Sequence, residues 1–194
     1  MRRQRTTPPM PIPNRADSSG ATVLLPLTRD QFAIIDADDA QQLSGVFWCA
    51  HFISGRWYAS GRIMGEGGWS RLVLMHRYIM NAKHGELIDH KDGNALHNSK
   101  SNLRVATKSQ NAANSRLRSD NKIGYRGVSW DRSREKWRAY CRPHGKQIHI
   151  GYFDDPKDAA HAYDLCAITQ FGRFARTNYD LGLIDIPPES SLET

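Results

Sequence analysis

Residues 86–111 read ELIDHKDGNALHNSKSNLRVATKSQN, and this stretch decides the fold in the middle of the chain. Two short runs with apolar residues, at 87–88 and 103–106, flank a segment made almost entirely of Asp, Asn, Gly, Ser, His and Lys. Such residues favour turns, because their short polar side chains hydrogen-bond to the neighbouring backbone. The pattern therefore predicts a β-hairpin with a long polar loop, and KSQNAANSRLR at 108–118 then predicts a short helix.

Asp89 and His90 stand next to each other where the first of these runs ends. Neighbours on a strand point to opposite faces, but at a strand end both side chains can reach one pocket. A carboxylate beside an imidazole is a common way to join a metal ligand to a general base. The pair alone leaves a second interpretation open, in which Asp89 bonds to turn amides and His90 is exposed.

Several polar elements follow one another in a fixed order around this pair. Asp-His at 89–90 is followed by Asp-Gly-Asn at 92–94, by Ser-Asn-Leu-Arg at 101–104 and by a predicted helix that carries Asn111. This order resembles the HNH family of phage-type homing endonucleases, also called ββα-metal or His-Me finger nucleases. The resemblance covers residues 88–114 and extends upstream to Met-His-Arg at 75–77.

The resemblance implies a role for each matched residue. Asp89 and Asn111 would be metal ligands, and His90 would be the general base that takes a proton from the attacking water. Asn102 would tie the loop so that His90 is aimed correctly. His76 and Arg77 would orient the fold or contact the DNA backbone, with plain packing as the alternative for this last pair.

The cofactor implied by the resemblance is one divalent metal ion, with Mg²⁺ expected first and Mn²⁺ as the alternative. Hard oxygen donors such as an Asp carboxylate and an Asn amide suit these ions, whereas sulfur does not. Many family members have His where this chain has Asn111, so Asp89 is left as the only anionic ligand. The three cysteines, at 49, 141 and 166, form no C-x-x-C pair, and we expect neither a structural zinc nor a disulfide framework.

Beyond residue 123 the sequence alternates like three strands and then a helix. YRGVSWD, KWRAYCR and QIHIGYF fit strands, and DDPKDAAHAYDLCAITQFG at 154–172 fits one amphipathic helix. Residues 124–180 resemble the ethylene-response-factor, or Apetala-two, DNA-binding domain through Tyr-Arg-Gly-Val at 125–128, Lys-Trp-Arg-Ala at 136–139 and Ile-Gly-Tyr-Phe at 150–153. The resemblance implies that the sheet, rather than a helix, lies in the major groove.

Alternation along the second strand of this module separates two faces. Trp137, Ala139 and Cys141 would pack on the helix, while the residues between them would face outward. The resemblance and this alternation place the DNA contacts on Arg126, Arg132, Arg134, Arg138, Tyr140, Arg142, Gln147 and His149. Ser129 and Tyr140 stand where plant members generally have Arg and Glu, so the plant target sequence does not carry over.

The charge distribution favours a nucleic-acid partner. Residues 116–150 hold ten basic and three acidic side chains, which equals the whole net charge of +7, with aromatic residues between them. This is the expected footprint of a nucleic-acid surface, and a solvated basic face is the alternative. No apolar stretch approaches the roughly 18 residues of a membrane span, and the N-terminus lacks the apolar run of a secretion signal. We expect a monomeric protein that binds double-stranded DNA and no membrane. Its expected location is the cytoplasm, which is that of the host cell if the protein is phage-encoded.

The predicted fold class is α+β, with a small β-rich part that leads into a ββα-metal HNH nuclease module. A three-stranded antiparallel sheet packed on one helix would follow. The expected divisions are a disordered basic arm (1–20), a nuclease module (21–116, with a β-rich part at 21–74 and a ββα-metal core at 75–116), a linker (117–123), the DNA-binding domain (124–180) and a tail (181–194).

The expected function is that of an HNH homing endonuclease, a divalent-metal-dependent enzyme that hydrolyses DNA phosphodiester bonds. The C-terminal sheet would recognise the target. The alternative is a DNA-binding regulator, or an inactive remnant of such a nuclease, that keeps the fold without cutting. The simultaneous presence of Asp89, His90 and Asn111 favours the nuclease, since a decayed site should have lost at least one of them.

Overall fold

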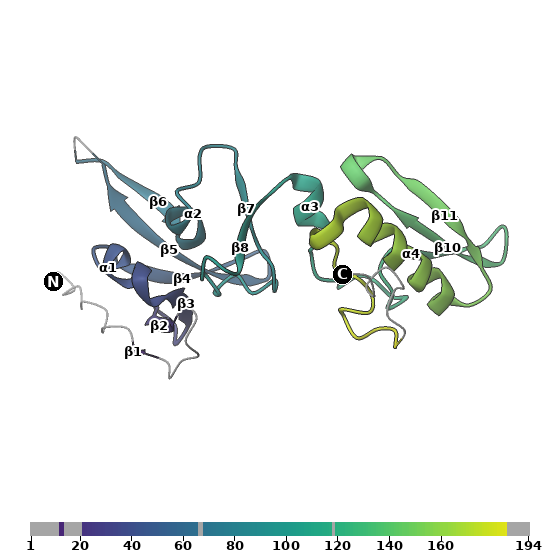
Figure 1. The fold of residues 1–194 in the computed structure, drawn as a ribbon, viewed down its shortest axis with the longest axis horizontal. Coiled ribbons are helices and arrows are strands. Elements are labelled where there is room, and N and C mark those ends of the chain that lie inside the picture. Colours follow the sequence, from purple (N-terminus) through teal and green to yellow (C-terminus); the bar gives the residue numbers. More distant parts are fainter. Residues whose placement is uncertain (1–11, 14–20, 66–67, 118, 186–194) are drawn as a thin grey trace. The chain divides into compact units, whose positions relative to one another are not determined.

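The computed structural model describes residues 12–13, 21–65, 68–117 and 119–185 (Figure 1). Most of the predicted 1–20 arm and residues 186–194 of the predicted tail lie outside this part of the chain. The chain divides into two compact units, residues 1–105 (the N-terminal unit) and 106–194 (the C-terminal unit). Both contain small sheets and short helices, which confirms the α+β class.

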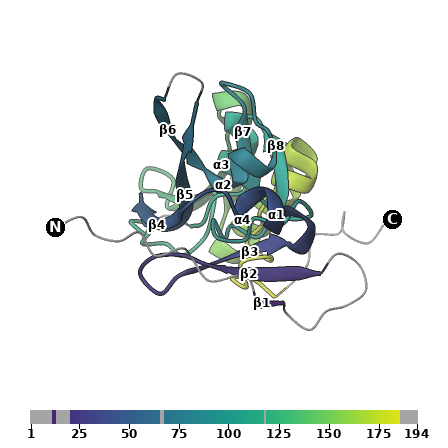
Figure 2. The same ribbon diagram turned by 90° about the vertical axis from the view of Figure 1, so that its left-hand side faces the viewer.

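The N-terminal unit contains two small antiparallel sheets (Figure 2). The first has the order β1-β2-β3, with bounds Ile12–Pro13, Thr22–Pro26 and Phe32–Asp36. The 3-10 turn η1 and the helix α1 follow at Ala37–Asp39 and Ala40–Leu43. The second sheet has the order β4-β5-β6, with bounds Trp48–Ile53, Arg56–Met64 and Ser70–Leu74. The sequence predicted these strands as one β-rich part, and the structure divides them because η1 and α1 interrupt the chain after β3.

One apolar core joins the two sheets to the middle of the chain. Ile35, Leu43, Trp48 and Met75 are almost completely buried in it, and Leu103 of the hairpin belongs to the same core. Each large apolar side chain contributes about 1.5–3 kcal/mol when it is fully buried. The hairpin is therefore positioned by the core that also stabilises both sheets.

The hairpin predicted at the start is present in this unit. Helix α2 (Met75–Ile79) follows β6 directly. Farther along the chain, β7 (Leu87–His90) pairs with β8 (Leu103–Ala106) in a two-stranded sheet, and the two strands lie side by side in Figure 2.

The polar loop between β7 and β8 is attached to the edge of the first sheet. The Ile34 N–H donates to the Leu96 carbonyl at 2.9 Å, and the Asn98 N–H donates to the Ile34 carbonyl at 2.7 Å. These two bonds form a parallel bridge between Ile34 and His97. The loop is therefore held by backbone pairing, which restricts the positions of the residues beside His90.

The C-terminal unit begins with helix α3 (Lys108–Ala113), which follows β8 after a single residue. Its three-stranded antiparallel sheet has the order β11-β10-β9, with bounds Ile148–Phe153, Lys136–Cys141 and Val128–Asp131. Helix α4 (Pro156–Phe171) packs against this sheet (Figure 1). The 3-10 turns η2 and η3 lie at Pro143–Gly145 and Gly172–Phe174.

Local sequence signals account for the ends of α4. The Asp155 side chain accepts a hydrogen bond from the Lys157 N–H at 2.6 Å, and Pro156 occupies the first helical position, where its missing N–H is not needed. Gly172 ends the helix at φ +52°. The buried stripe of the helix consists of Ala159, Ala160, Tyr163, Asp164 and Ala167.

The predicted alternation of β10 agrees with the burial of its side chains. Ala139 and Cys141 are buried, and Ala139 shares an apolar cluster with residues of α4. Ile150 of the neighbouring strand packs against the same cores, but Ile148, which the alternation also places inward, is exposed. Strict alternation does not hold along β11, because its pairing with β10 shifts register between Ala139 and Tyr140, and Ile148 is the first residue of the strand.

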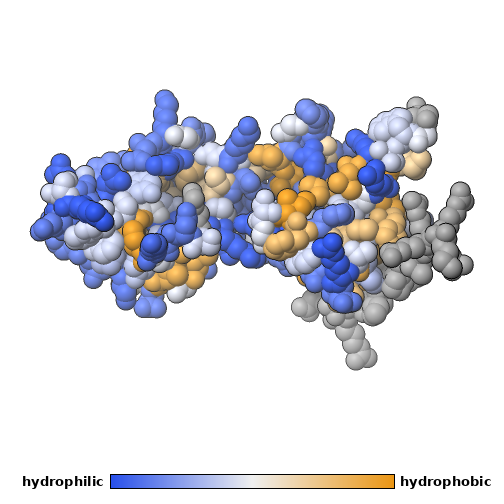
Figure 3. All heavy atoms as spheres, turned by 180° about the vertical axis from the view of Figure 1, so that it is seen from behind, coloured by the Kyte–Doolittle hydropathy of each residue, from blue (hydrophilic) through white to orange (hydrophobic). Residues whose placement is uncertain are grey.

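Among the described residues, no helix is long and apolar enough to cross a membrane. Figure 3 shows hydrophilic residues over most of the face that it displays, with smaller apolar patches between them.

Gly127 is the glycine whose lack of a side chain the fold requires most directly. Its φ is +72°, and a Cβ atom placed there would lie 1.9 Å from Cδ2 of the buried Tyr163 ring. The ring therefore packs directly on the backbone at the beginning of β9.

Substitution of Gly127 by Ala should destabilise the C-terminal unit by about 2–5 kcal/mol, because left-handed strain and overpacking add. Gly182→Ala is the matched control. Gly182 has φ +66°, and no atom of the described residues, its chain neighbours aside, lies within 4 Å of the position that a Cβ would take. The control should lose only about 1–2 kcal/mol from backbone strain. Urea unfolding of the two variants measures the difference, and equal losses would rule out the ring contact as the reason for glycine.

Candidate active site and nucleic-acid interface

Strand β7 places Asp89 and His90 at the point where the hairpin enters its polar loop. Ile88 packs against the core of the N-terminal unit. Asp89 and His90 are only 5% and 7% exposed, so the alternative interpretation, in which His90 is exposed, is wrong for His90. Their burial requires polar partners, because a buried charge or imidazole without hydrogen bonds is strongly unfavourable.

Asp89 finds its partner on the opposite strand of the hairpin. Its Oδ2 accepts a hydrogen bond from Nε of Arg104 at 2.8 Å and forms an ion pair with Nη2, also at 2.8 Å, and both side chains are buried. A hydrogen bond between two charged groups is stronger than one between neutral groups, so Arg104 restricts the Asp89 carboxylate. Arg104 is part of the Ser-Asn-Leu-Arg element, but the sequence analysis predicts no role for it. The antiparallel pairing of 87–90 with 103–106 is the signal that could have found it.

His90 is oriented by a loop residue that sequence reasoning did not single out. His90 Nε2 lies 3.4 Å from Oδ1 of Asn98, and Asn98 is completely buried. The Asn98 side-chain amide in turn donates to the Leu96 carbonyl at 3.0 Å. Burial lowers the pKa of His90, although the hydrogen bond to Asn98 and the carboxylates of Asp92 and Asp89 act in the opposite direction.

Asn102 ties the loop to itself, as the sequence predicted for its amide. Its Nδ2 donates to Asp92 Oδ1 at 3.0 Å and to the His97 carbonyl at 2.8 Å, and its Oδ1 accepts from the Asp92 N–H at 3.2 Å. His97 Nδ1 lies 2.7 Å from the other oxygen of Asp92. Whether this network aims His90 during a reaction stays a prediction.

His76 and Arg77 lie on α2 and have different surroundings. The buried His76 ring makes an edge contact with His90, with ring centroids 4.9 Å apart. Burial, together with the smaller effects of nearby His90 and Arg77, lowers the pKa of His76 to about 3. The Arg77 guanidinium donates to the carbonyls of Lys83 and Glu86, so it braces the loop that leads to β7.

Asn111 lies on α3 in the C-terminal unit, whereas Asp89 and His90 lie in the N-terminal unit. Its side chain is exposed. Within the described ranges, no group of three or more His, Cys, Asp or Glu side chains is arranged to hold a metal ion. The convergence of Asp89 and Asn111 on one ion therefore stays a prediction, as does the ββα-metal arrangement.

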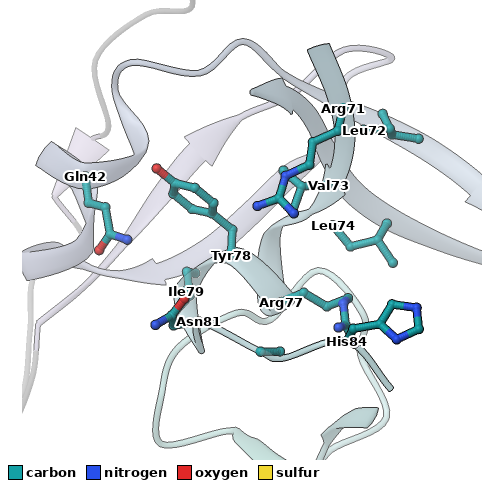
Figure 4. A pocket seen from close by; sticks show the side chains of 11 residues that line it. Gln42, Arg71, Leu72, Val73, Leu74, Arg77, Tyr78, Ile79, Asn81 and His84 are labelled. Carbon is teal, nitrogen blue, oxygen red and sulfur yellow. The ribbon is translucent and has the colours of Figure 1, made fainter. Parts of the chain in front are cut away.

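A surface hollow of the N-terminal unit is lined by residues of α1, β6 and α2 and of the loop that follows α2 (Figure 4). Arg71, Tyr78 and His84 are among them, and Arg77 is the one predicted site residue that contributes. Asp89 and His90 do not line it. The hollow is therefore separate from the candidate catalytic pair.

The face of the C-terminal sheet that points away from α4 carries arginine and tyrosine side chains. The guanidinium carbons of Arg138 and Arg142 lie 5.4 and 5.3 Å from the centre of the Tyr140 ring. Arg142 also donates to Gln147 Oε1, with its closest nitrogen at 2.8 Å. Stacking on an aromatic ring holds a guanidinium in place and leaves its edges available for hydrogen bonds.

A second aromatic residue, which sequence reasoning did not assign to this face, extends it. Tyr152 pairs with Arg138 across the strands. The Arg134 guanidinium lies 4.8 Å from the Tyr152 ring centre, and the His149 ring lies 4.6 Å from it. The sequence shows Tyr152 only as part of the Ile-Gly-Tyr-Phe motif. Because cross-strand partners lie on the same face of a sheet, its pairing with Arg138 is the signal that could have identified it. Arg132, the remaining predicted contact in the β9–β10 turn, is exposed.

Arg126, which sequence reasoning placed among the DNA contacts, has partners inside its own unit. Its guanidinium donates to Tyr163 Oη at 3.0 Å, to the Ser115 carbonyl at 2.5 Å, and to the Ala112 carbonyl and Ser115 Oγ, each at 2.9 Å. These bonds use four of its five N–H donors. A DNA contact by Arg126 stays a prediction, and its position differs from that of the outward-facing arginines.

Two family models match consecutive parts of the chain. Residues 73–113 match the model of the HNH endonuclease family, and residues 123–173 match that of the AP2 domain. The chain therefore carries an HNH-type domain followed by an AP2-type domain. The gap between the two matches is residues 114–122, and the predicted 117–123 linker stays a prediction.

Individual proteins are similar to parts of the chain. Protein 3.8 of Escherichia phage T7 is 41% identical over 63 residues, which are 32% of this chain and 52% of that protein. A protein of Acanthamoeba polyphaga mimivirus, named as an uncharacterized HNH endonuclease, is 37% identical over 91 residues, 47% of this chain and 46% of its own length. An APETALA2-like protein of Oryza sativa is 40% identical over 57 residues, 29% of this chain and 13% of that protein. The chain thus spans about half the length of the two viral relatives, and no solved structure matches it.

The low pKa of His76 predicts acid sensitivity of the metal-free protein. His76 is neutral in the fold, with a pKa of about 3, and binds a proton near pH 6.5 when unfolded. Between these values the unfolded state holds more protons, so the contribution of His76 is complete above pH 6.5 and is lost as the pH falls toward 3.

Urea unfolding at several pH values in EDTA measures this dependence. The free energy of unfolding should decrease below pH 6.5 in the wild type, and the slope should be shallower in His76→Phe. His84→Phe is the control, because His84 is exposed and should leave the slope unchanged. An identical slope in wild type and His76→Phe would contradict the assignment.

Proposed function

We propose that this chain, with an HNH-type domain followed by an AP2-type domain, is a divalent-metal-dependent endonuclease that hydrolyses phosphodiester bonds in double-stranded DNA. The observation that carries the proposal is the buried Asp89-His90 pair at the entrance of the polar loop, within the segment that matches HNH endonucleases. We infer a homing-type enzyme, in which the AP2-type sheet recognises the target.

His90 is the proposed general base. An imidazole with a pKa of about 6.5 or lower is mostly neutral at pH 7 and can accept a proton from water. The contact between Nε2 and Asn98 Oδ1 favours the tautomer with the proton on Nε2, which puts the basic lone pair on Nδ1. Asn98 would therefore hold the tautomer, and its own bonds to the carbonyls of Ile34 and Leu96 would hold Asn98.

Asp89 and Asn111 are the proposed ligands of the metal ion. A carboxylate and an amide oxygen fit Mg²⁺ or Mn²⁺, which prefer hard donors. When bound, the ion would stabilise negative charge on the phosphate and on the departing 3′ oxygen. Arg104 would limit the rotation of the Asp89 carboxylate through its hydrogen bond from Nε and its ion pair through Nη2.

The outward face of the AP2-type sheet is the proposed DNA-reading surface. Arg138, Arg142 and Arg134 are each held against a tyrosine ring, so their orientation is already restricted before DNA binds. Restricted guanidinium groups lose less entropy on binding. The net charge of +7 on residues 116–150 would provide the sequence-independent attraction to phosphates.

A second candidate function is a DNA-binding protein that does not cut. The pairing of Asp89 with Arg104 favours this alternative, because a cation already neutralises the single anionic ligand. The two candidates differ in one measurable property, which is cleavage of DNA in the presence of a divalent ion.

Substitution of His90 by Ala should lower the cleavage rate of supercoiled plasmid in Mg²⁺ or Mn²⁺ by about 10²–10⁴-fold, as expected for loss of a general base. DNA affinity should be retained, and EDTA should abolish cleavage by the wild type. His84→Ala is the matched control, since it removes an exposed histidine of the same unit and should cut at the wild-type rate. Full activity of purified His90→Ala protein would refute the role of His90, and an inactive wild type would favour the non-cutting alternative.

Substitution of Arg142 by Ala should weaken binding to a preferred duplex, selected from a random library, by about 1–3 kcal/mol if Arg142 contacts a base edge. A scrambled duplex should lose less. Lys157→Ala removes one positive charge from exposed residues of α4, on the other side of the sheet, and should change neither affinity by a comparable amount. Equal weakening by both variants, on both duplexes, would mean that Arg142 contributes only general electrostatic attraction. Fluorescence anisotropy at two salt concentrations separates these outcomes.

A further inference from the structure

The sequence of helix α3 lies within the HNH match, but the helix packs within the C-terminal unit, which contains the AP2-type module. The HNH match ends at residue 113 and therefore includes α3, whereas the AP2 match begins only at residue 123. In the structure α3 groups with residues 106–194 and contacts α4, η2 and η3. The helix that carries Asn111 is therefore held by the module that is proposed to read DNA.

Arg126 is the principal side-chain contact between that module and α3. It donates to the Ala112 carbonyl in the last turn of α3 and to the carbonyl and hydroxyl oxygens of Ser115, two residues beyond the helix end. The last carbonyls of a helix lack partners within the helix and carry partial negative charge, so a guanidinium is well suited to this position. A helix of six residues is marginal by itself and depends on such contacts.

The position of Arg126 is itself determined by the module. Its backbone N–H donates to Asn178 Oδ1 at 2.7 Å, and its backbone carbonyl accepts from Asn178 Nδ2 at 3.2 Å. Its Nε donates to the hydroxyl of Tyr163, whose ring packs on Gly127. Arg126 is thus held from both sides before its remaining donors reach α3.

A second, smaller contact restrains the other end of the helix. The His144 N–H, in turn η2 between β10 and β11, donates to Ser109 Oγ at 2.8 Å. The two anchors lie before and after Asn111 in the chain, so they restrain both the tilt and the rotation of α3.

We propose that Arg126 is a positioning residue of the nuclease reaction, which sets the orientation of Asn111 from within the AP2-type module. The proposal rests on the proposed function and differs from the usual expectation for this arginine, which is a direct contact with DNA. It implies that the AP2-type module does not merely tether the nuclease to its target. It also supports the helix that supplies part of the metal site.

Hydrogen exchange of the metal-free, full-length protein tests the contact independently of activity. Amides of residues 107–116 should exchange about tenfold faster or more in Arg126→Ala, since charge-assisted hydrogen bonds at the helix end are lost. Exchange in α4 should stay close to that of the wild type, which shows that the module is still folded. Ser109→Ala should give a smaller increase in the same segment and provides a second test if Arg126→Ala unfolds. Thr169→Ala, which removes an exposed hydroxyl bonded to the Leu165 carbonyl, is its control and should leave residues 107–116 unchanged.

Cleavage and binding by Arg126→Lys separate positioning from DNA contact. Lysine keeps the charge but cannot make the forked set of hydrogen bonds to Ala112, Ser115 and Tyr163. We expect the cleavage rate at saturating DNA to fall on the order of 10²-fold in both Arg126→Ala and Arg126→Lys. The DNA concentration for half-saturation, and the dissociation constant measured in EDTA, should stay within about twofold for Arg126→Lys.

Opposite results overturn the proposal. Normal cleavage by Arg126→Lys together with weakened DNA binding by Arg126→Ala would identify Arg126 as a phosphate contact. Unchanged exchange of residues 107–116 in both Arg126→Ala and Ser109→Ala would show that these contacts do not hold α3. If the wild type cuts no DNA with any divalent ion, the proposed function fails, and exchange still decides whether Arg126 holds the helix.

Discussion

The C-terminal unit depends most on the hydrogen bonds of the buried Asn178 carboxamide. This carboxamide bonds to the backbone of Arg126 on both sides of that residue, to the Ala160 carbonyl and to the Asp164 carboxylate, so it joins the entrance of the sheet to the helix behind it. Asn178 and Asp164 are completely buried, and burial raises the pKa of Asp164 although several hydrogen bonds act against this. A buried polar network of this kind is favourable only when its members are paired, which makes the geometry of the Arg126 segment highly specific. The AP2 match ends at residue 173, so the chain just beyond the matched segment completes the fold.

In the N-terminal unit, hydrogen bonds likewise hold the loop between β7 and β8, which has almost no apolar residues of its own. Its polar side chains bond mainly to one another and to the backbone, while the parallel bridge to Ile34 attaches the loop to a sheet. Leu103 then anchors the returning strand in the core. The candidate base and the candidate metal ligand therefore stand on a rigid support, although the loop around them is polar. Such preorganisation is what a site that must orient water and phosphate requires.

The division of the chain into two units does not coincide with the division into two families. Residues 106–113 match the nuclease family and belong to the C-terminal unit, in which α3 contacts α4, η2 and η3. The linker predicted at 117–123 overlaps the gap between the two family matches. The packing of the chain instead places the boundary between the units near the end of β8. Under the proposed function, such a shared element would couple the two modules, because a change in one would alter the support of an element that the other requires.

The sequence by itself determined the local features of this protein. Alternation placed Ala139 and Cys141 inward on β10, the Asp-Pro signal began α4 at Pro156, and the polar segment after His90 marked the hairpin loop. These features depend on residues close together in the chain, and periodicity or turn chemistry suffices to identify them. Only the tertiary structure decided that Arg104 pairs with Asp89, that Asn98 faces His90 and that Arg126 points to α3. Each of these contacts joins side chains whose meeting depends on strand register or on the packing of separate elements, and no local pattern in the sequence specifies which long-range partner a buried polar group will find.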